Sequence, residues 1–108
     1  MPRFLVTYHG GGMPESEEGR QQAMAAFGAW IGATGKALVD PGAPLGPART
    51  VSAGSVADGA APGPFNGYSI LDAADLDAAV GLVRSHPYVE RGGSLQISEA
   101  VTPQAASS

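Results

Sequence analysis

An α+β fold with an antiparallel sheet and two helices on one face is predicted by two stretches of the sequence. Residues 63–101 contain an alternating strand, a capped helix and a second alternating strand. The opening PRFLVTYHG has the β-branched and aromatic side chains of another strand. With the segments between them, the expected order is β-α-β, an extended arm, then β-α-β, which is the ferredoxin-like arrangement βαββαβ.

Residues 3–8 form the first expected strand, and a glycine turn leads from it to the first helix. Ser16 offers a hydroxyl that caps a helix, and the two acids directly after it favour the positive end of the helix dipole. Gly35 supplies the stop after about Ala33. The side chains at spacings of three and four, which should pack on the sheet, are Ala23, Met24, Phe27, Trp30 and Ile31.

The middle of the chain is expected to be extended and rich in loops. A short strand over residues 36–40 is closed by Pro41 and Gly42, and the glycines and prolines up to Pro47 argue against regular pairing. An extended arm around residues 49–56 follows, and the loop DGAAPGPF comes after it.

Two more strands flank the second expected helix. In NGYSILDA, Tyr68 and Ile70 share one face of the strand and Ser69 and Leu71 share the other. In SLQISEAV, apolar and polar side chains alternate in the same way, so one face of this last strand is buried.

The second helix is expected to begin at Asp75, whose carboxylate caps it, and to end at His86 because Pro87 breaks it. Its inner stripe consists of Leu76, Ala79, Val80 and Val83. We expect residues 1–101 to form a single domain and residues 102–108 to be a disordered tail.

Composition excludes several classes of function. The net charge of −4 lacks the basic face that nucleic acid requires, and no apolar run is long enough to span a membrane. The chain has no cysteine, and its two histidines lack metal-binding spacing, so we expect no metal and no cofactor. A cytoplasmic protein without nucleic-acid or membrane partners is therefore expected.

The sheet face opposite the helices would be bare in a monomer. Such a face would expose an apolar patch on the order of several hundred Å², which is more than monomers usually carry. We therefore expect a homodimer in which two sheets meet face to face and form a barrel-like core.

Four segments, in this order, resemble the YCII-related family and its branch named for a DGPF motif. They are FLVTYHG, ALVDPG, DGAAPGPF and GYSILDAADLDAAVGLVRSHPYVERGGSLQISEAV, and the resemblance covers roughly residues 3–101. It implies a dimeric α/β barrel. The DGPF signature is split here, because three residues separate Asp58–Gly59 from Gly63–Pro64–Phe65.

The resemblance also implies two kinds of activity. Some members look like enzymes that act on small ring compounds, including elimination of HCl from a chlorinated hydroquinone, with a histidine and an aspartate near the first helix. Others lie beside sigma factors and have no settled activity. Here the corresponding positions are about Gln22 and Ala33, neither of which transfers a proton, and the usual Asp-Pro after the second helix reads His86–Pro87.

Three residues are candidates for proton transfer. His9 ends the first strand, and His86 ends the second helix, where the dipole favours an imidazolium. Asp40 precedes Pro-Gly, which orients a carboxylate toward a cleft at the strand end or simply forms an Asx-turn. In the competing interpretation both histidines are structural: His9 forms a hydrogen bond with the backbone at the end of its strand, and His86 caps the C-terminus of the helix.

Five residues are candidates for ligand binding. Tyr8 and Tyr68 offer phenolic hydroxyls, and Phe27 and Trp30 offer an apolar wall. Arg49, on the extended arm, is suited to bidentate pairing with a ligand carboxylate. Core packing for the aromatic residues and a solvated ion pair for the arginine are the alternatives.

Two functions stay open on this sequence. The first is binding of a small cyclic metabolite between sheet and helices, with cofactor-free acid/base chemistry such as isomerisation, cyclisation or elimination. The second is a non-catalytic interaction or regulatory protein associated with sigma factors. Convergence of His9, Asp40 and Tyr8 or Tyr68 on a cavity of roughly 300 Å³ or more favours the first function, and a packed interior with both histidines in solvent removes it.

Overall fold

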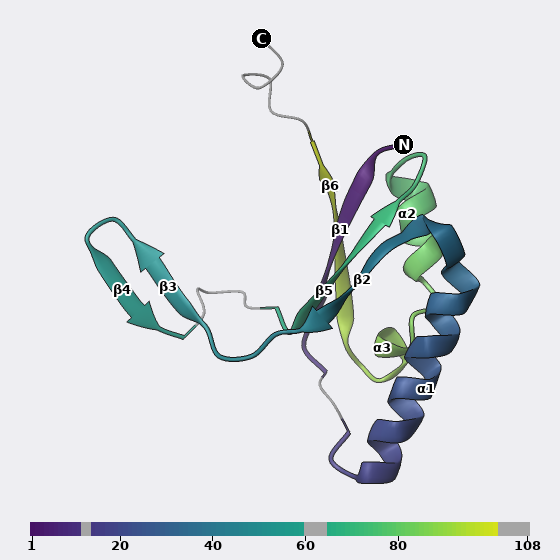
Figure 1. Cartoon of the computed structure of the whole chain (residues 1–108), viewed down its shortest axis with the longest axis horizontal. Helices are drawn as coiled ribbons and strands as arrows, with labels where there is room; N and C mark the ends of the chain where they lie inside the picture. Colours follow the sequence, from purple (N-terminus) through teal and green to yellow (C-terminus); the bar gives the residue numbers. More distant parts are fainter. Residues whose placement is uncertain (12–13, 60–64, 102–108) are drawn as a thin grey trace.

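The α+β class is confirmed by the computed structural model, which describes residues 1–11, 14–59 and 65–101. A four-stranded antiparallel sheet has the strand order β2-β5-β1-β6, which is the ferredoxin-like order (Figure 1). Its strands are β1 Arg3–His9, β2 Leu38–Pro44, β5 Gly67–Asp72 and β6 Ser94–Ala100. The helices are α1 Glu17–Thr34, α2 Leu76–Val83 and α3 Pro87–Glu90, with a short 3-10 turn at Gly35–Ala37.

Helices α1, α2 and α3 lie on one face of the sheet (Figure 1). The helix-facing side chains of the strands form the core with helix side chains, and its fully or nearly buried members are Phe4, Val6, Trp30, Leu71, Ala73, Ala79 and Val83. The alternation predicted for β5 is confirmed, since Ser69 and Leu71 are buried on the helix side. Tyr68 and Ile70 are half-buried.

Both ends of α1 are as predicted. The Ser16 hydroxyl accepts a hydrogen bond of 2.9 Å from the Gly19 N–H, and Gly35 ends the helix with a φ of 64°. Ala23 and Trp30 are buried, whereas Met24 was expected to pack on the sheet and is 66% exposed. Met24 instead borders a cavity beside the helix.

The prediction that strand pairing stops at Pro41 is wrong. β2 continues to Pro44 through two register shifts, which lie between Leu38 and Asp40 and between Asp40 and Ala43. Gly42 has a φ of 75°, and a Cβ atom there would overlap the backbone carbonyl of Tyr68. Bulges and this glycine absorb the residues that cannot pair regularly.

The extended arm is a β-hairpin, which we did not predict. Strands β3 Arg49–Ser52 and β4 Ser55–Asp58 pair with each other and form a separate two-stranded sheet. The hairpin projects from the body of the molecule (Figure 1). Its paired side chains Val51 and Val56 are 75% and 63% exposed.

The prediction for the end of the second helix is also wrong. Asp75 caps α2 as expected, with its Oδ1 2.8 Å from the Ala78 N–H, but the helix ends at Val83. Pro87 begins α3, where its missing N–H and fixed φ favour the first helical turn. Within α2, Ala79 and Val83 are buried, so the inner stripe is narrower than predicted; Leu76 and Val80 are exposed.

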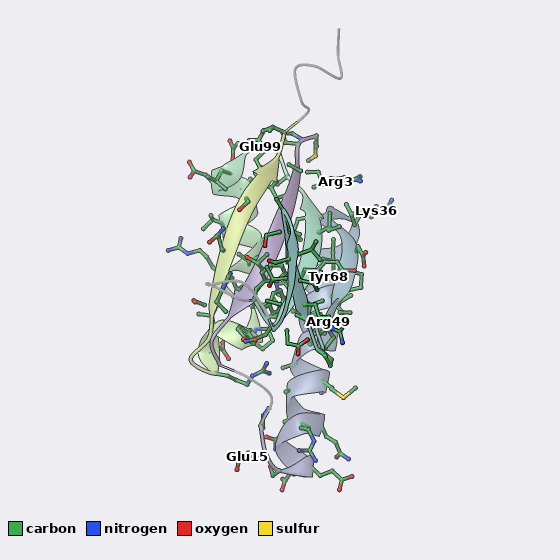
Figure 2. All side chains as sticks on the ribbon, turned by 90° about the vertical axis from the view of Figure 1, so that its left-hand side faces the viewer. Arg3, Glu15, Lys36, Arg49, Tyr68 and Glu99 are labelled. Carbon is green, nitrogen blue, oxygen red and sulfur yellow. The ribbon has the colours of Figure 1, made fainter. Side chains whose placement is uncertain are left out.

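The side of the sheet away from the helices faces the viewer in Figure 2, with the labelled Tyr68 near its middle. Its side chains mix Leu5, which is 37% exposed, with polar residues of β6 such as Gln96 and Ser98. None of the helices described here has the length and apolarity that crossing a membrane requires. The expected tail and most of the loop DGAAPGPF lie outside the described residues.

Candidate functional site

A cavity of about 470 Å³ lies between α1, α3 and the β2–β5 side of the sheet. This volume is in the range of small-molecule sites. Its walls are mainly apolar and aromatic. The lining residues are Tyr8, Ala23, Met24, Phe27, Pro41, Gly42, Ala43, Pro44, Asn66, Gly67, Tyr68, His86, Pro87, Tyr88 and Arg91.

Five residues form one chain of hydrogen bonds at this cavity. The Tyr8 hydroxyl lies 2.9 Å from His86 Nε2 and 2.6 Å from the Ser69 hydroxyl. Ser69 donates in turn to the Pro41 carbonyl at 2.8 Å. At the other end, the Tyr88 N–H donates to His86 Nδ1 at 3.0 Å.

The two ends of this chain fix the direction of every hydrogen bond in it. His86 Nδ1 accepts from an N–H, so the neutral ring carries its proton on Nε2 and donates it to Tyr8. The Pro41 carbonyl can only accept, so the Ser69 hydroxyl donates to it and accepts from Tyr8. Tyr8 is therefore a polarised phenol, with a neutral imidazole donating to its oxygen.

His86 is held neutral by its surroundings. The residue is 2% exposed, and burial followed by the positive charge of Arg91 lowers the pKa of His86 to about 4. The expected imidazolium at a helix C-terminus is thus wrong. His86 caps the N-terminus of α3, whose positive dipole end also disfavours a charged ring.

Tyr8 also stays neutral at physiological pH. Burial raises the pKa of Tyr8 above its usual value, the hydrogen bond between Tyr8 and Ser69 acts in the opposite direction, and Tyr88 adds to the rise. Tyr8 and His86 therefore present neutral hydrogen-bonding groups at the cavity.

Aromatic packing holds the imidazole in place. The His86 ring centroid lies 4.4 Å from that of Trp30, 5.0 Å from Tyr8 and 5.5 Å from Phe27. The Trp30 indole donates to the Leu82 carbonyl at 3.0 Å and does not line the cavity. Trp30 thus packs against the imidazole from the core, whereas Phe27 forms part of the cavity wall.

Tyr88 is fixed in a slot beside the same cavity. Its hydroxyl donates to the Gly10 carbonyl and accepts from Asn66 Nδ2 at 3.1 Å. A Cβ atom at Gly93 would overlap the Tyr88 ring, and one at Gly11 would lie 3.3 Å from it. Glycine at position 93 therefore leaves room for a buried tyrosine.

His9, Asp40 and Arg49 are absent from the described lining of the cavity. His9 follows Tyr8 in β1, so its side chain lies on the other face of the sheet, where Nε2 is 2.8 Å from the Thr7 hydroxyl. Asp40 accepts from the Gly42 N–H at 2.8 Å, as in the Asx-turn interpretation. Arg49 pairs with Asp58 at 3.4 Å on the exposed hairpin.

Sequence reasoning missed three residues of the site. The alternation of its strand predicts that Ser69 shares a face with Leu71, and a polar residue beside an apolar one on the same face was the available signal. Tyr88 and Arg91 belong to a helix of four residues and its end, and a helix this short has no detectable periodicity. Of the predicted residues, Tyr8, Phe27 and His86 line the cavity together. Tyr68 borders it from β5, but this residue is opposite Thr7 in the sheet, so its side chain lies on the face away from the helices and the predicted hydrogen bond from its hydroxyl to a ligand in this cavity is not supported.

No protein-family profile matches the chain, and no curated protein sequence matches it significantly. Among solved structures, it is similar to 5-chloro-2-hydroxyhydroquinone dehydrochlorinase (TftG) from Burkholderia phenoliruptrix AC1100, in complex with 2,5-dihydroxybenzoquinone. The TM-score is 0.51 at 20% identity, and the match covers 95% of this chain and 97% of that chain. The likeness shows the fold of the chain, a ferredoxin-like α+β domain.

Proposed function

We propose that the protein binds a small cyclic metabolite in the cavity between α1 and the sheet, with Tyr8 and His86 as the polar groups that meet it. The observation that carries the proposal is the directed hydrogen-bond chain, which places a polarised phenol in a mainly apolar cavity of about 470 Å³. The similar dehydrochlorinase is named for a ring compound and is bound to another. This supports a ring compound as the ligand class.

The chemistry that this arrangement supports is stabilisation of negative charge on a ligand oxygen. The Tyr8 hydroxyl, turned from Ser69 to the ligand, would donate to a carbonyl or enolate oxygen, and the His86 Nε2–H bond to Tyr8 strengthens that donation. Isomerisation, cyclisation and elimination next to a ring carbonyl or hydroxyl group develop negative charge on such an oxygen. They need no cofactor under this proposal.

The alternative function, a non-catalytic interaction or regulatory protein, is favoured by one observation. In the described residues no carboxylate lines the cavity, and His86 is a weak base because its pKa is lowered to about 4. Gln22 and Ala33 replace the dyad that the YCII-related resemblance implies. Under this alternative the cavity binds a regulatory ligand without turning it over.

We also propose that the chain is a homodimer of the YCII-related kind and resides in the cytoplasm. The radius of gyration is 15.8 Å, against about 13 Å expected for a compact chain of this length, and the β3–β4 hairpin projects from the body of the molecule. A two-stranded hairpin with exposed Val51 and Val56 is marginally stable alone. A second copy covering the hairpin and the helix-free sheet face would stabilise both.

Light scattering tests the dimer. The measured mass should be twice the chain mass of 10.8 kDa, and a monomer at micromolar concentration would refute the dimer.

Binding tests the functional proposal directly. We expect 2,5-dihydroxybenzoquinone or simple phenols to cause saturable shifts in ¹H–¹⁵N spectra at residues of α3 and β1. Tyr8→Phe keeps the ring and removes the hydroxyl, so affinity should fall about tenfold, the typical effect of one lost hydrogen bond. His9→Ala is the control outside the cavity lining and should bind normally. Equal affinity of the wild type and Tyr8→Phe would contradict the proposed role of Tyr8.

A further inference from the structure

We propose that Arg91 binds an anionic oxygen group of the ligand, which makes the ligand class a small ring compound that carries a carboxylate. This inference rests on the proposed function and adds a second anchor point to the cavity. Arg91 follows α3 directly and lines the cavity together with His86 and Tyr8. It is the one Lys or Arg among the described lining residues.

The guanidinium of Arg91 has no acidic partner among the residues that the structure describes. Every Asp and Glu of the sequence lies within the described residues, and the ion pairs found there are Arg3 with Asp72 and Arg49 with Asp58. The neighbouring Glu90 and Arg91 both line a second hollow between α1 and α3. These two residues nevertheless form no ion pair with each other.

The Nε atom of Arg91 is buried and has no hydrogen-bond acceptor in the described structure. Native proteins seldom leave a charged donor in this state, because it has lost water without gaining a partner. This atom is closed to solvent, so a ligand oxygen in the cavity would reach the terminal nitrogens of the guanidinium, for which the described structure shows no hydrogen bond. A ligand anion bound there would compensate the charge that the described residues leave without a partner.

The Tyr88 ring holds the guanidinium in a defined position. The central carbon of the Arg91 guanidinium lies 5.5 Å from the ring centroid, within the range of a cation–π interaction. The Tyr88 ring is itself fixed by Gly10, Asn66 and Gly93. A planar guanidinium held in this way is suited to parallel hydrogen bonds with a carboxylate.

Two arguments favour a monoanionic carboxylate over a phosphate. A single cation neutralises one charge, whereas a phosphate usually needs several donors, and the remaining lining is mainly apolar. The protein also carries a net charge of −4, which disfavours highly charged ligands. The positive charge of Arg91 lowers the pKa of His86, which places the two groups within electrostatic reach of one ligand.

Matched ligands test this inference separately from the proposed function. We would titrate wild-type protein with 4-hydroxybenzoate and with 4-hydroxybenzamide, which have similar shapes and differ in charge. The acid should bind about ten to a hundred times more tightly, as expected for charge-assisted hydrogen bonds. Equal affinities would overturn the role of Arg91 and leave the proposed function standing. If neither compound nor any neutral phenol or quinone binds, the proposed function fails as well.

Substitutions of Arg91 test whether this residue causes the preference for the acid over the amide. Arg91→Gln should abolish the preference for the acid and leave the affinity for the amide unchanged, and Arg91→Lys should keep a reduced preference. Arg84→Gln, at an exposed arginine that follows α2 outside the cavity, is the control and should bind as the wild type. Loss of both ligands to the same extent in Arg91→Gln and Arg91→Lys would show a merely structural arginine and contradict the inference.

Discussion

Replacing His86 by asparagine should reveal how the fold excludes a proton from the imidazole. The pKa of His86 is lowered from 6.5 to about 4, so the unfolded chain takes up a proton over this range that the folded protein does not. The free energy of unfolding therefore falls as the pH drops from about 6.5 to 4, and no further loss from this group follows below that pH. Asparagine keeps a cap acceptor for the Tyr88 N–H and cannot gain a proton.

The magnitude follows from the size of the shift. The shift of the His86 pKa from 6.5 to about 4 corresponds to a loss of about 3 kcal/mol in the free energy of unfolding on acidification. We expect roughly half of this loss, because water in the adjoining cavity screens the charge. His86→Asn should be less stable than the wild type at pH 7, by about 1–3 kcal/mol, because it loses the bond to Tyr8 and ring packing against Trp30.

Urea denaturation at pH 7.0, 6.0, 5.0 and 4.5 measures both proteins under the same conditions. The ten carboxylates are common to the two chains, so their contribution cancels in the difference of unfolding free energies. We expect this difference to shrink by about 1–1.5 kcal/mol between pH 7.0 and 4.5. A difference that stays constant, or that grows toward low pH, would refute a neutral, buried His86.

Four further substitutions probe the packing around the site and the helix that forms its wall. Tyr8→Phe should lower the free energy of unfolding by about 1–3 kcal/mol in urea denaturation, since His86 Nε2–H and Ser69 lose their shared partner; an unchanged stability would mean that water replaces the hydroxyl. Gly93→Ala should lower the free energy of unfolding by about 1–3 kcal/mol, because the new Cβ would overlap the Tyr88 ring. Gly28→Ala in α1 meets open space and should raise the free energy of unfolding by about 0.5–1 kcal/mol. A wild-type melting temperature for Gly93→Ala would show that Tyr88 moves freely. Ser16→Ala removes the cap of α1 and should lower stability by about 1 kcal/mol, measured by thermal unfolding, and no change would indicate that the cap is dispensable.

Local signals predicted most of the elements correctly. The caps at Ser16 and Asp75 are hydrogen bonds between residues three positions apart, so a short sequence window contains both partners. The alternation of Ser69 and Leu71 with their neighbours needs only the period of a strand. These elements in order were sufficient for the ferredoxin-like arrangement.

The errors arose where tertiary contacts override a local rule. β2 continues beyond Pro41 because bulges pair it with β5, and a partner strand cannot be seen in a local window. The helix α3 has four residues, too few for a periodic pattern, so Pro87 was interpreted as the end of α2 when it is the start of α3. The same error reversed the expected charge of His86.

The site could be predicted from residue type only in part. Tyr8, Phe27 and His86 were identified because their side chains suit proton transfer or ring binding. The partners that give them a role are distant in the sequence, since 61 residues separate Tyr8 from Ser69 and 78 separate it from His86. No local pattern in a single sequence encodes such pairs.

The central claim, a neutral His86–Tyr8 pair that meets a ring ligand, is tested most directly by ¹⁵N NMR of the His86 imidazole with and without 2,5-dihydroxybenzoquinone. We expect a neutral ring with its proton on Nε2 at every pH above about 5, and a saturable shift of its nitrogens on addition of the quinone. An imidazole that titrates near 6.5 and does not respond to the quinone would contradict the account.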